Sequence, residues 1–172
     1  FNETVNKSAI LRNTFVVGGR EAELTGEDGN FDGAHRAIYT YQANAFRVEQ
    51  NELSKATTTY ALTEGAVVGY TGAYSNQVYK NTSTDMDYAF VAEGECVDVS
   101  DLTTTGLAFL CNQNVQNVEE DFTIRSGDPD PPTSHSIKMF QGSTTRSAGN
   151  TFTPQQNGSS PYYNYHNRAE AL

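Results

Sequence analysis

Two segments with alternating side chains decide the fold class expected from the sequence: Asp85-Met-Asp-Tyr-Ala-Phe-Val-Ala-Glu93 and Val118-Glu-Glu-Asp-Phe-Thr-Ile-Arg125. In the first, the even positions 86–92 are apolar or aromatic. In the second, Phe122 and Ile124 alternate with polar residues. A period of two is typical of a β-strand that buries one face.

Further short runs of this kind occur along the chain, separated by glycine, proline and asparagine turns. They lie at 9–17, 37–43, 46–48, 57–62, 66–70, 77–80, 96–99, 107–111, 136–140 and 150–152. No helical period and no internal repeat emerge from counted matches. The sequence therefore predicts an all-β fold, an antiparallel β-sandwich or jelly-roll, in which 86–92, 96–99, 107–111 and 118–125 are adjacent. A small β-barrel is the alternative.

The length of 172 residues fits one folded domain. We expect a polar N-terminal extension over 1–8, the β-sandwich over 9–142, and a polar, tyrosine-containing C-terminal segment over 143–172. No run of 18 apolar residues exists that could span a membrane.

The net charge of −10 lies in one part of the chain. Eleven carboxylates and one base, Arg125, fall between Asp85 and Asp130, whereas the remaining ten acids and ten bases cancel. Such a segment repels nucleic acid and anionic membranes, so we expect neither as a partner.

Cys96 and Cys111 lie in this acidic segment, and we expect them to form a disulfide in an extracellular protein. Two buried thiols are the alternative. Four sequons are candidate glycosylation sites, and they begin at Asn2, Asn6, Asn81 and Asn157.

Asp28-Gly-Asn-Phe-Asp-Gly33 matches the first half of a calcium-binding loop, so Asp28, Asn30 and Asp32 are candidate Ca²⁺ ligands. The twelfth position is Tyr39 instead of glutamate, and a plain turn uses the same residues. The carboxylates around the two cysteines are a second candidate for a cation.

The sequence holds no recognisable motif of a nucleophilic hydrolase, zinc protease or phosphate-binding loop, which weighs against an enzyme without deciding the question. We expect a non-catalytic secreted structural or adhesive glycoprotein, a self-associating subunit of an extracellular fibre or coat that exchanges terminal strands. The alternative is an extracellular β-barrel that binds a small ligand or carbohydrate, with enzymatic activity left open.

Residues near the two ends are the candidates for self-association. Residues 9–17 form the longest strand-like apolar run, which can pair within its own sheet or with a neighbouring copy. The tyrosines near the C-terminus offer a contact surface, or they cover an edge of their own sheet. The candidates are Ile10, Leu11, Phe15, Val17, Tyr162, Tyr163 and Tyr165.

Overall fold

The computed structural model describes residues 8–18, 34–57, 62–72, 74–98, 100–125, 137–143, 145–154 and 163–168. These residues contain thirteen strands. In chain order the strands are β1 (Ser8–Leu11), β2 (Thr14–Val17), β3 (His35–Tyr41), β4 (Phe46–Glu49), β5 (Glu52–Lys55), β6 (Thr63–Gly69), β7 (Ser75–Tyr79), β8 (Thr82–Thr84), β9 (Tyr88–Glu93), β10 (Gly106–Leu110), β11 (Gln113–Val115), β12 (Glu120–Arg125) and β13 (Tyr163–Asn167). Within these ranges no helix is long and apolar enough to cross a membrane.

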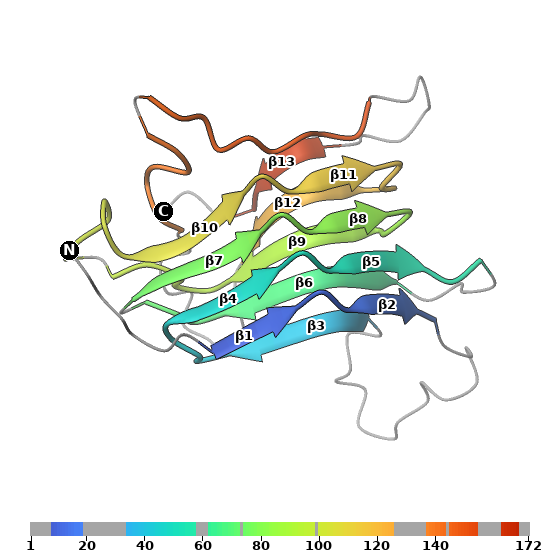
Figure 1. Ribbon diagram of the computed structural model, residues 1–172, viewed down its shortest axis with the longest axis horizontal. Coiled ribbons are helices and arrows are strands. Elements are labelled where there is room, and N and C mark those ends of the chain that lie inside the picture. The colour runs from blue at the N-terminus through green and yellow to red at the C-terminus, as the bar shows by residue number, and fades with distance from the viewer. Residues whose placement is uncertain are drawn as a thin grey trace.

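The strands form three sheets, and every pairing between named strands is parallel. Sheet A has the order β1-β4-β7-β10, sheet B the order β2-β5-β8-β11, and sheet C the order β3-β6-β9-β12-β13. The chain visits A, B and C in turn and then begins the next coil on top of the last, as Figure 1 shows. The architecture is a parallel β-helix.

This arrangement corrects the antiparallel β-sandwich or jelly-roll, and the small barrel, expected from the sequence. The alternating pattern correctly predicts strands at β9, β10 and β12. However, β9 and β12 are parallel neighbours in sheet C while β10 lies in sheet A, and residues 96–98 form a corner instead of a strand. Alternation reports which face of a strand is buried, and it carries no information on the direction of the neighbouring strand.

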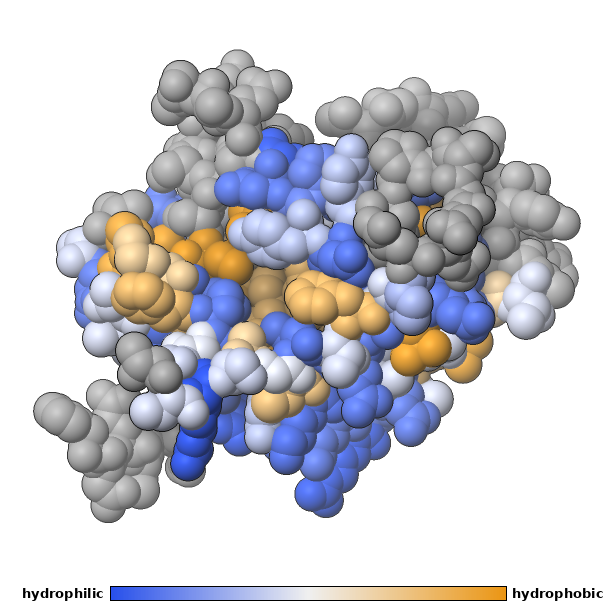
Figure 2. Space-filling model, turned by 90° about the horizontal axis from the view of Figure 1, so that it is seen from above, coloured by the Kyte–Doolittle hydropathy of each residue, from blue (hydrophilic) through white to orange (hydrophobic). Residues whose placement is uncertain are grey.

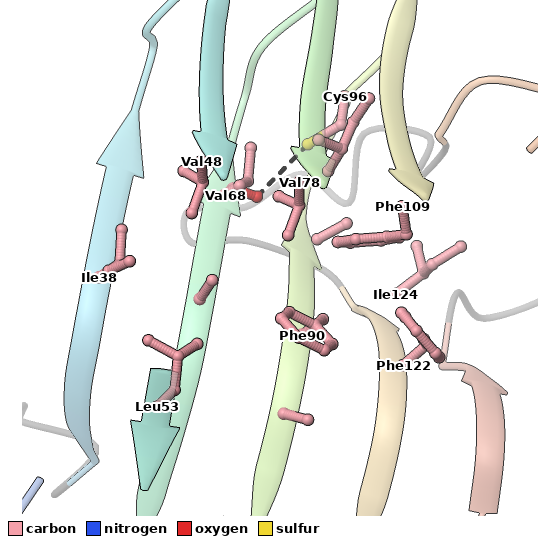
Figure 3. Packing of buried hydrophobic residues seen from close by; sticks show 14 of the residues in the cluster. Ile38, Val48, Leu53, Val68, Val78, Phe90, Cys96, Phe109, Phe122 and Ile124 are labelled. Atoms are coloured by element: carbon pink, nitrogen blue, oxygen red, sulfur yellow. Dashed lines mark hydrogen bonds between the residues drawn. The ribbon is translucent and has the colours of Figure 1, made fainter. Parts of the chain in front are cut away.

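The core lies inside the coils, where inward-facing side chains of the three sheets meet (Figure 3). Residues at equivalent positions of successive coils stack on each other. Phe90 and Phe122 stack in this way with their ring centroids 5.4 Å apart, and Phe109 of sheet A lies 5.4 Å from Phe122 across the interior. Strands β6 and β9 are buried along almost their whole length, so these central coils anchor the fold.

The corner between sheets A and B repeats in each coil. An asparagine occupies it at positions 13, 51, 81, 112 and 150, and the residue before each asparagine has a positive φ. These preceding residues are Arg12, Gln50, Lys80, Cys111 and Gly149, with φ between 54° and 70°. A left-handed residue turns the chain sharply without interrupting the stack, although four of these five are not glycine.

The disulfide expected between Cys96 and Cys111 is not present, and both cysteines carry free thiols. The Cys96 carbonyl accepts a hydrogen bond from the Leu107 main-chain N–H. Cys111 lies four positions after Leu107, which in an extended strand places their Cα atoms about 13 Å apart. The Cα atoms of bonded cysteines lie within about 7 Å of each other. The cysteine-based argument for an extracellular location is lost with the bond.

Candidate functional site

The asparagines at the A–B corner form a continuous ladder through the protein. The side-chain oxygen of each asparagine accepts hydrogen bonds from the main-chain N–H and the Nδ2 of the asparagine one coil earlier. For Asn51 bonding to Asn81 the two distances are 3.0 and 2.9 Å. The same pair of bonds joins 13 to 51, 81 to 112, and 112 to 150.

Each ladder asparagine after the first also bonds back to the coil before it. The Nδ2 of Asn81 donates to the Val48 carbonyl at 3.0 Å, and Asn51, Asn112 and Asn150 make the equivalent bond. Asn51, Asn81 and Asn112 are at most 1% exposed. A buried amide needs all its partners, and here every partner is supplied by the neighbouring coil.

The candidate sequon at Asn81 falls on this ladder. Its Nδ2 donates both hydrogens, to Val48 and Asn112, and the residue is fully buried. The folded chain therefore presents no amide at this position for a glycan. The sequons at Asn2, Asn6 and Asn157 lie outside the described residues.

The outer face of sheet C carries charged side chains that are mostly buried: those of Glu64 and Glu93 are 0% and 12% exposed, and those of Arg125 and Arg36 are 20% and 24% exposed. Arg125 donates to Glu64 at 2.6 Å and to Glu93 through Nε at 3.0 Å, and Arg36 donates to the same Glu64 carboxylate at 2.7 Å. Burial alone would lower the pKa of Arg125, but the two carboxylates raise it overall. Each pair joins different coils, so removal of one partner would leave an uncompensated buried charge between stacked strands of sheet C.

A second group on this face surrounds Glu120. Its carboxylate oxygens accept from His166 at 2.8 Å, from Arg168 Nε at 3.0 Å and from the Thr123 hydroxyl at 2.5 Å. Both oxygens are thus engaged within the protein. Glu120 therefore acts as a cross-strand clamp that holds β13 beside β12.

Three further acids of the acidic segment, Asp87, Asp121 and Asp101, each have hydrogen-bond partners of their own. Asp87 pairs with Lys55 and Thr63, and Asp121 accepts from Asn117, Thr153 and Asn164. Hydrogen bonds from Thr104 and Thr103 lower the pKa of Asp101 to about 2. No group of three metal-ligating side chains occurs in the described part of the chain. Asp28, Asn30 and Asp32 lie outside it.

The two ends of the β-helix hold the residues that the sequence suggested for self-association. Ile10 and Leu11 are on β1, and Phe15 and Val17 are on β2, which are the outermost strands of sheets A and B. Tyr163 and Tyr165 are on β13, the outermost strand of sheet C at the opposite end. Tyr162 lies outside the described residues.

The C-terminal end is a fifth coil built mostly without named strands in sheets A and B. The side chain of Gln141 replaces a peptide at the edge of β10, because it accepts from the Phe109 N–H at 2.7 Å and donates to the Leu107 carbonyl at 3.2 Å. Thr151 then pairs with Gln113 beside sheet B, and β13 completes the coil in sheet C.

Comparison of the chain with protein-family models, with curated proteins and with solved structures finds no match. The expected secretion, fibre formation and calcium binding therefore receive no family support. The features of the molecule that bear on function are the ladder, the two ends and the charged face. Sequence reasoning missed the ladder, although its signal is present: an asparagine recurs after a left-handed residue at spacings of 38, 30, 31 and 38 residues.

Proposed function

We propose that this chain is a non-catalytic structural module that associates end to end with copies of itself. The observation that carries the proposal is that, among the described residues, the inward-facing rows are still partly exposed at both ends of the stack. A β-helix coil cannot bury its own upper and lower surfaces, so each coil depends on the next.

At the C-terminal end, Phe152 and Tyr165 continue inward-facing rows of the core. Tyr165 is in register with Phe122, and Phe152 packs edge-on against the same ring. They remain 48% and 51% exposed. Figure 2 looks down onto this end, and apolar side chains gather near its middle among polar ones.

At the opposite end, Ile10 and Phe15 occupy the equivalent inward rows. Ile10 is in register with Val48 and Phe15 with Leu53, and both pack against the buried core while remaining partly exposed themselves. A second copy stacked on this end would cover them, as β4 and β5 are covered by their neighbours. Burying such a row is favourable by about 25 cal/mol per Å² of apolar surface.

Sedimentation velocity over a hundredfold range of protein concentration tests the proposal. We expect the wild type to form species larger than a monomer and Phe152→Lys to shift it toward monomer, because a charge would be buried at the contact. Tyr74→Lys is the matched control, since Tyr74 is 57% exposed and lies between β6 and β7, at the start of the middle coil. A wild type that stays monomeric throughout contradicts the proposal, as does equal weakening by both variants.

A groove on the flank favours small-ligand binding as a second candidate. It has a volume of about 730 Å³ and is lined by residues that include Lys138, Met139, Phe140 and Arg146. Met139 and Phe140 are each 58% exposed beside the two bases, a combination suited to an anionic aromatic molecule. Binding of the fluorescent probe anilinonaphthalenesulfonate should fall in Phe140→Asp and persist in Val118→Asp. Equal binding by both variants excludes this groove.

A further inference from the structure

The unpaired groups at the two ends complement each other through the same hydrogen-bond rule that joins the internal coils. This inference rests on the proposed end-to-end association and names its register. The rule consists of three kinds of hydrogen bond between successive A–B corners, and all four internal junctions between coils follow it.

The first part joins the left-handed residue to the next coil. Its N–H donates to the carbonyl two positions before the next ladder asparagine. Arg12 donates in this way to Glu49, Gln50 to Tyr79, Lys80 to Leu110, and Cys111 to Ala148, at 2.7–3.1 Å.

The second part is the ladder itself, in which the N–H and Nδ2 of one asparagine donate to the Oδ1 of the next. The third part runs backward. The residue after each asparagine donates its N–H to the preceding asparagine's carbonyl: Glu52 to Asn13, Thr82 to Asn51, Gln113 to Asn81 and Thr151 to Asn112, at 2.8–2.9 Å.

The N-terminal end lacks the partners that this rule requires. No described residue donates to Asn13 Oδ1, and the Asn13 Nδ2, which internally would reach the preceding coil, bonds to the Leu11 carbonyl of its own coil at 3.0 Å. The Asn13 carbonyl accepts from the Glu52 N–H, so in this parallel pairing the Thr14 N–H points away from β5, toward the open side of β2. This end therefore offers one side-chain acceptor, one carbonyl and one donor.

The C-terminal end presents the opposite set. Among the described residues the main-chain N–H groups of Gly149 and Asn150 have no acceptor, and the Asn150 carbonyl has no donor. The Asn150 Nδ2 makes its backward bond to Phe109 at 2.9 Å, which leaves its other hydrogen for a following coil. These are the groups that Leu11, Asn13 and Thr14 would meet.

We propose that a second copy of this chain continues the asparagine ladder, with Asn150 of one copy bonded to Asn13 of the next. In this register Gly149 donates to Leu11, the N–H and Nδ2 of Asn150 donate to Asn13 Oδ1, and Thr14 donates to the Asn150 carbonyl. Phe152 then lies on Phe15, because each is two positions after its ladder asparagine. The contact is head to tail, so it leaves both outer ends open and builds a linear assembly.

Engineered cysteines test the register. In a Cys111→Ser background, the pair Thr14→Cys and Thr151→Cys places exposed, outward-facing residues directly opposite each other between copies. Adjacent strands lie about 5 Å apart, within the range for a disulfide. We expect mild oxidation to give covalent dimers, trimers and higher species on a non-reducing gel, all returning to monomer on reduction.

The matched control pairs Thr151→Cys with Val16→Cys, another exposed outward-facing residue on β2. Its offset of two residues places the Cα atoms about 8 Å apart, which is too far to bond. Thr14→Cys alone can give dimers at most. Asn13→Ala should also weaken wild-type association by about tenfold or more, since it removes the acceptor of two hydrogen bonds.

The outcomes separate this inference from the proposed function. If sedimentation shows that the wild type associates but the Thr14–Thr151 pair gives no covalent series, the register is wrong and end-to-end association stands. A covalent series of equal extent from the Val16–Thr151 pair also overturns the register. If the wild type never associates, both the proposed function and this inference fail.

Discussion

Asn81→Ala should be among the most damaging single substitutions in this protein. The side chain takes part in four hydrogen bonds: Oδ1 accepts from the N–H and Nδ2 of Asn51, and Nδ2 donates to Val48 and Asn112, all at 2.9–3.1 Å. Alanine removes all four and leaves buried groups on both adjacent coils without partners. At about 1 kcal/mol for each bond, with more for groups left unsatisfied, we expect a loss of about 3–5 kcal/mol.

This loss is a large fraction of the 5–15 kcal/mol that typically stabilises a domain, so it should be plain in urea denaturation followed by circular dichroism. Measurements at low protein concentration keep association from contributing to the midpoint. The matched control is Asn44→Ala, because Asn44 is exposed, and it should change the free energy of unfolding by less than about 0.5 kcal/mol. Similar midpoints for the two variants would show that the ladder contributes little to stability.

Three other experiments test separate parts of the structure. Gly65→Ala should lower the melting temperature clearly, because a Cβ there would lie 2.3 Å from the Ala89 carbonyl oxygen. Gly69→Ala is the control, since the nearest atom to its Cβ would belong to the Tyr41 ring, at 3.2 Å, and equal melting temperatures for the two variants would contradict the packing of β6 on β9. Without reductant, a thiol reagent should modify half-buried Cys111 in the native protein and Cys96 only after unfolding, since Cys96 is buried and burial raises the pKa of its thiol. A change in the intact mass on reduction would instead reveal a disulfide. The Asp101 carboxyl should titrate with a pKa of about 2 by NMR, and Thr104→Ala should raise that pKa. Because the folded pKa is depressed, the contribution of these hydrogen bonds to stability is present above pH 4 and is lost as the pH falls through about 2. A measured pKa near the ordinary 3.8 would exclude these hydrogen bonds.

The strands could be predicted from the sequence, whereas their arrangement could not. Alternation at β9 and β12 depends on the buried inner face alone, and that signal is the same in a sandwich and in a β-helix. The prediction of one strand over 9–17 failed at Arg12 and Asn13, where the chain turns between sheets A and B. Nothing in the pattern Leu-Arg-Asn-Thr predicts a left-handed arginine, because non-glycine residues seldom adopt that conformation.

The ladder was within reach of the sequence but needed comparison of the right positions. Between the ladder asparagines of the second and fourth coils, the intervals are 30 and 31 residues, yet the first and last intervals are 38. Counting matches at one fixed period dilutes such a signal. Only the asparagine is common to all five corners, because its amide must both donate and accept along the stack, while outward-facing neighbours are free to differ.

The acidic segment illustrates why neighbours along this chain are a poor guide to neighbours in space. Counting charges between Asp85 and Asp130 suggested crowded carboxylates that call for a cation. In a β-helix, however, a side chain on the outer face lies beside residues one coil away. Asp87 accordingly meets Lys55 at a separation of 32 residues, and Glu120 meets Arg168 at a separation of 48. The bases that pair with these two acids thus come from other coils, so crowding of carboxylates along the sequence is no sign of crowding in space.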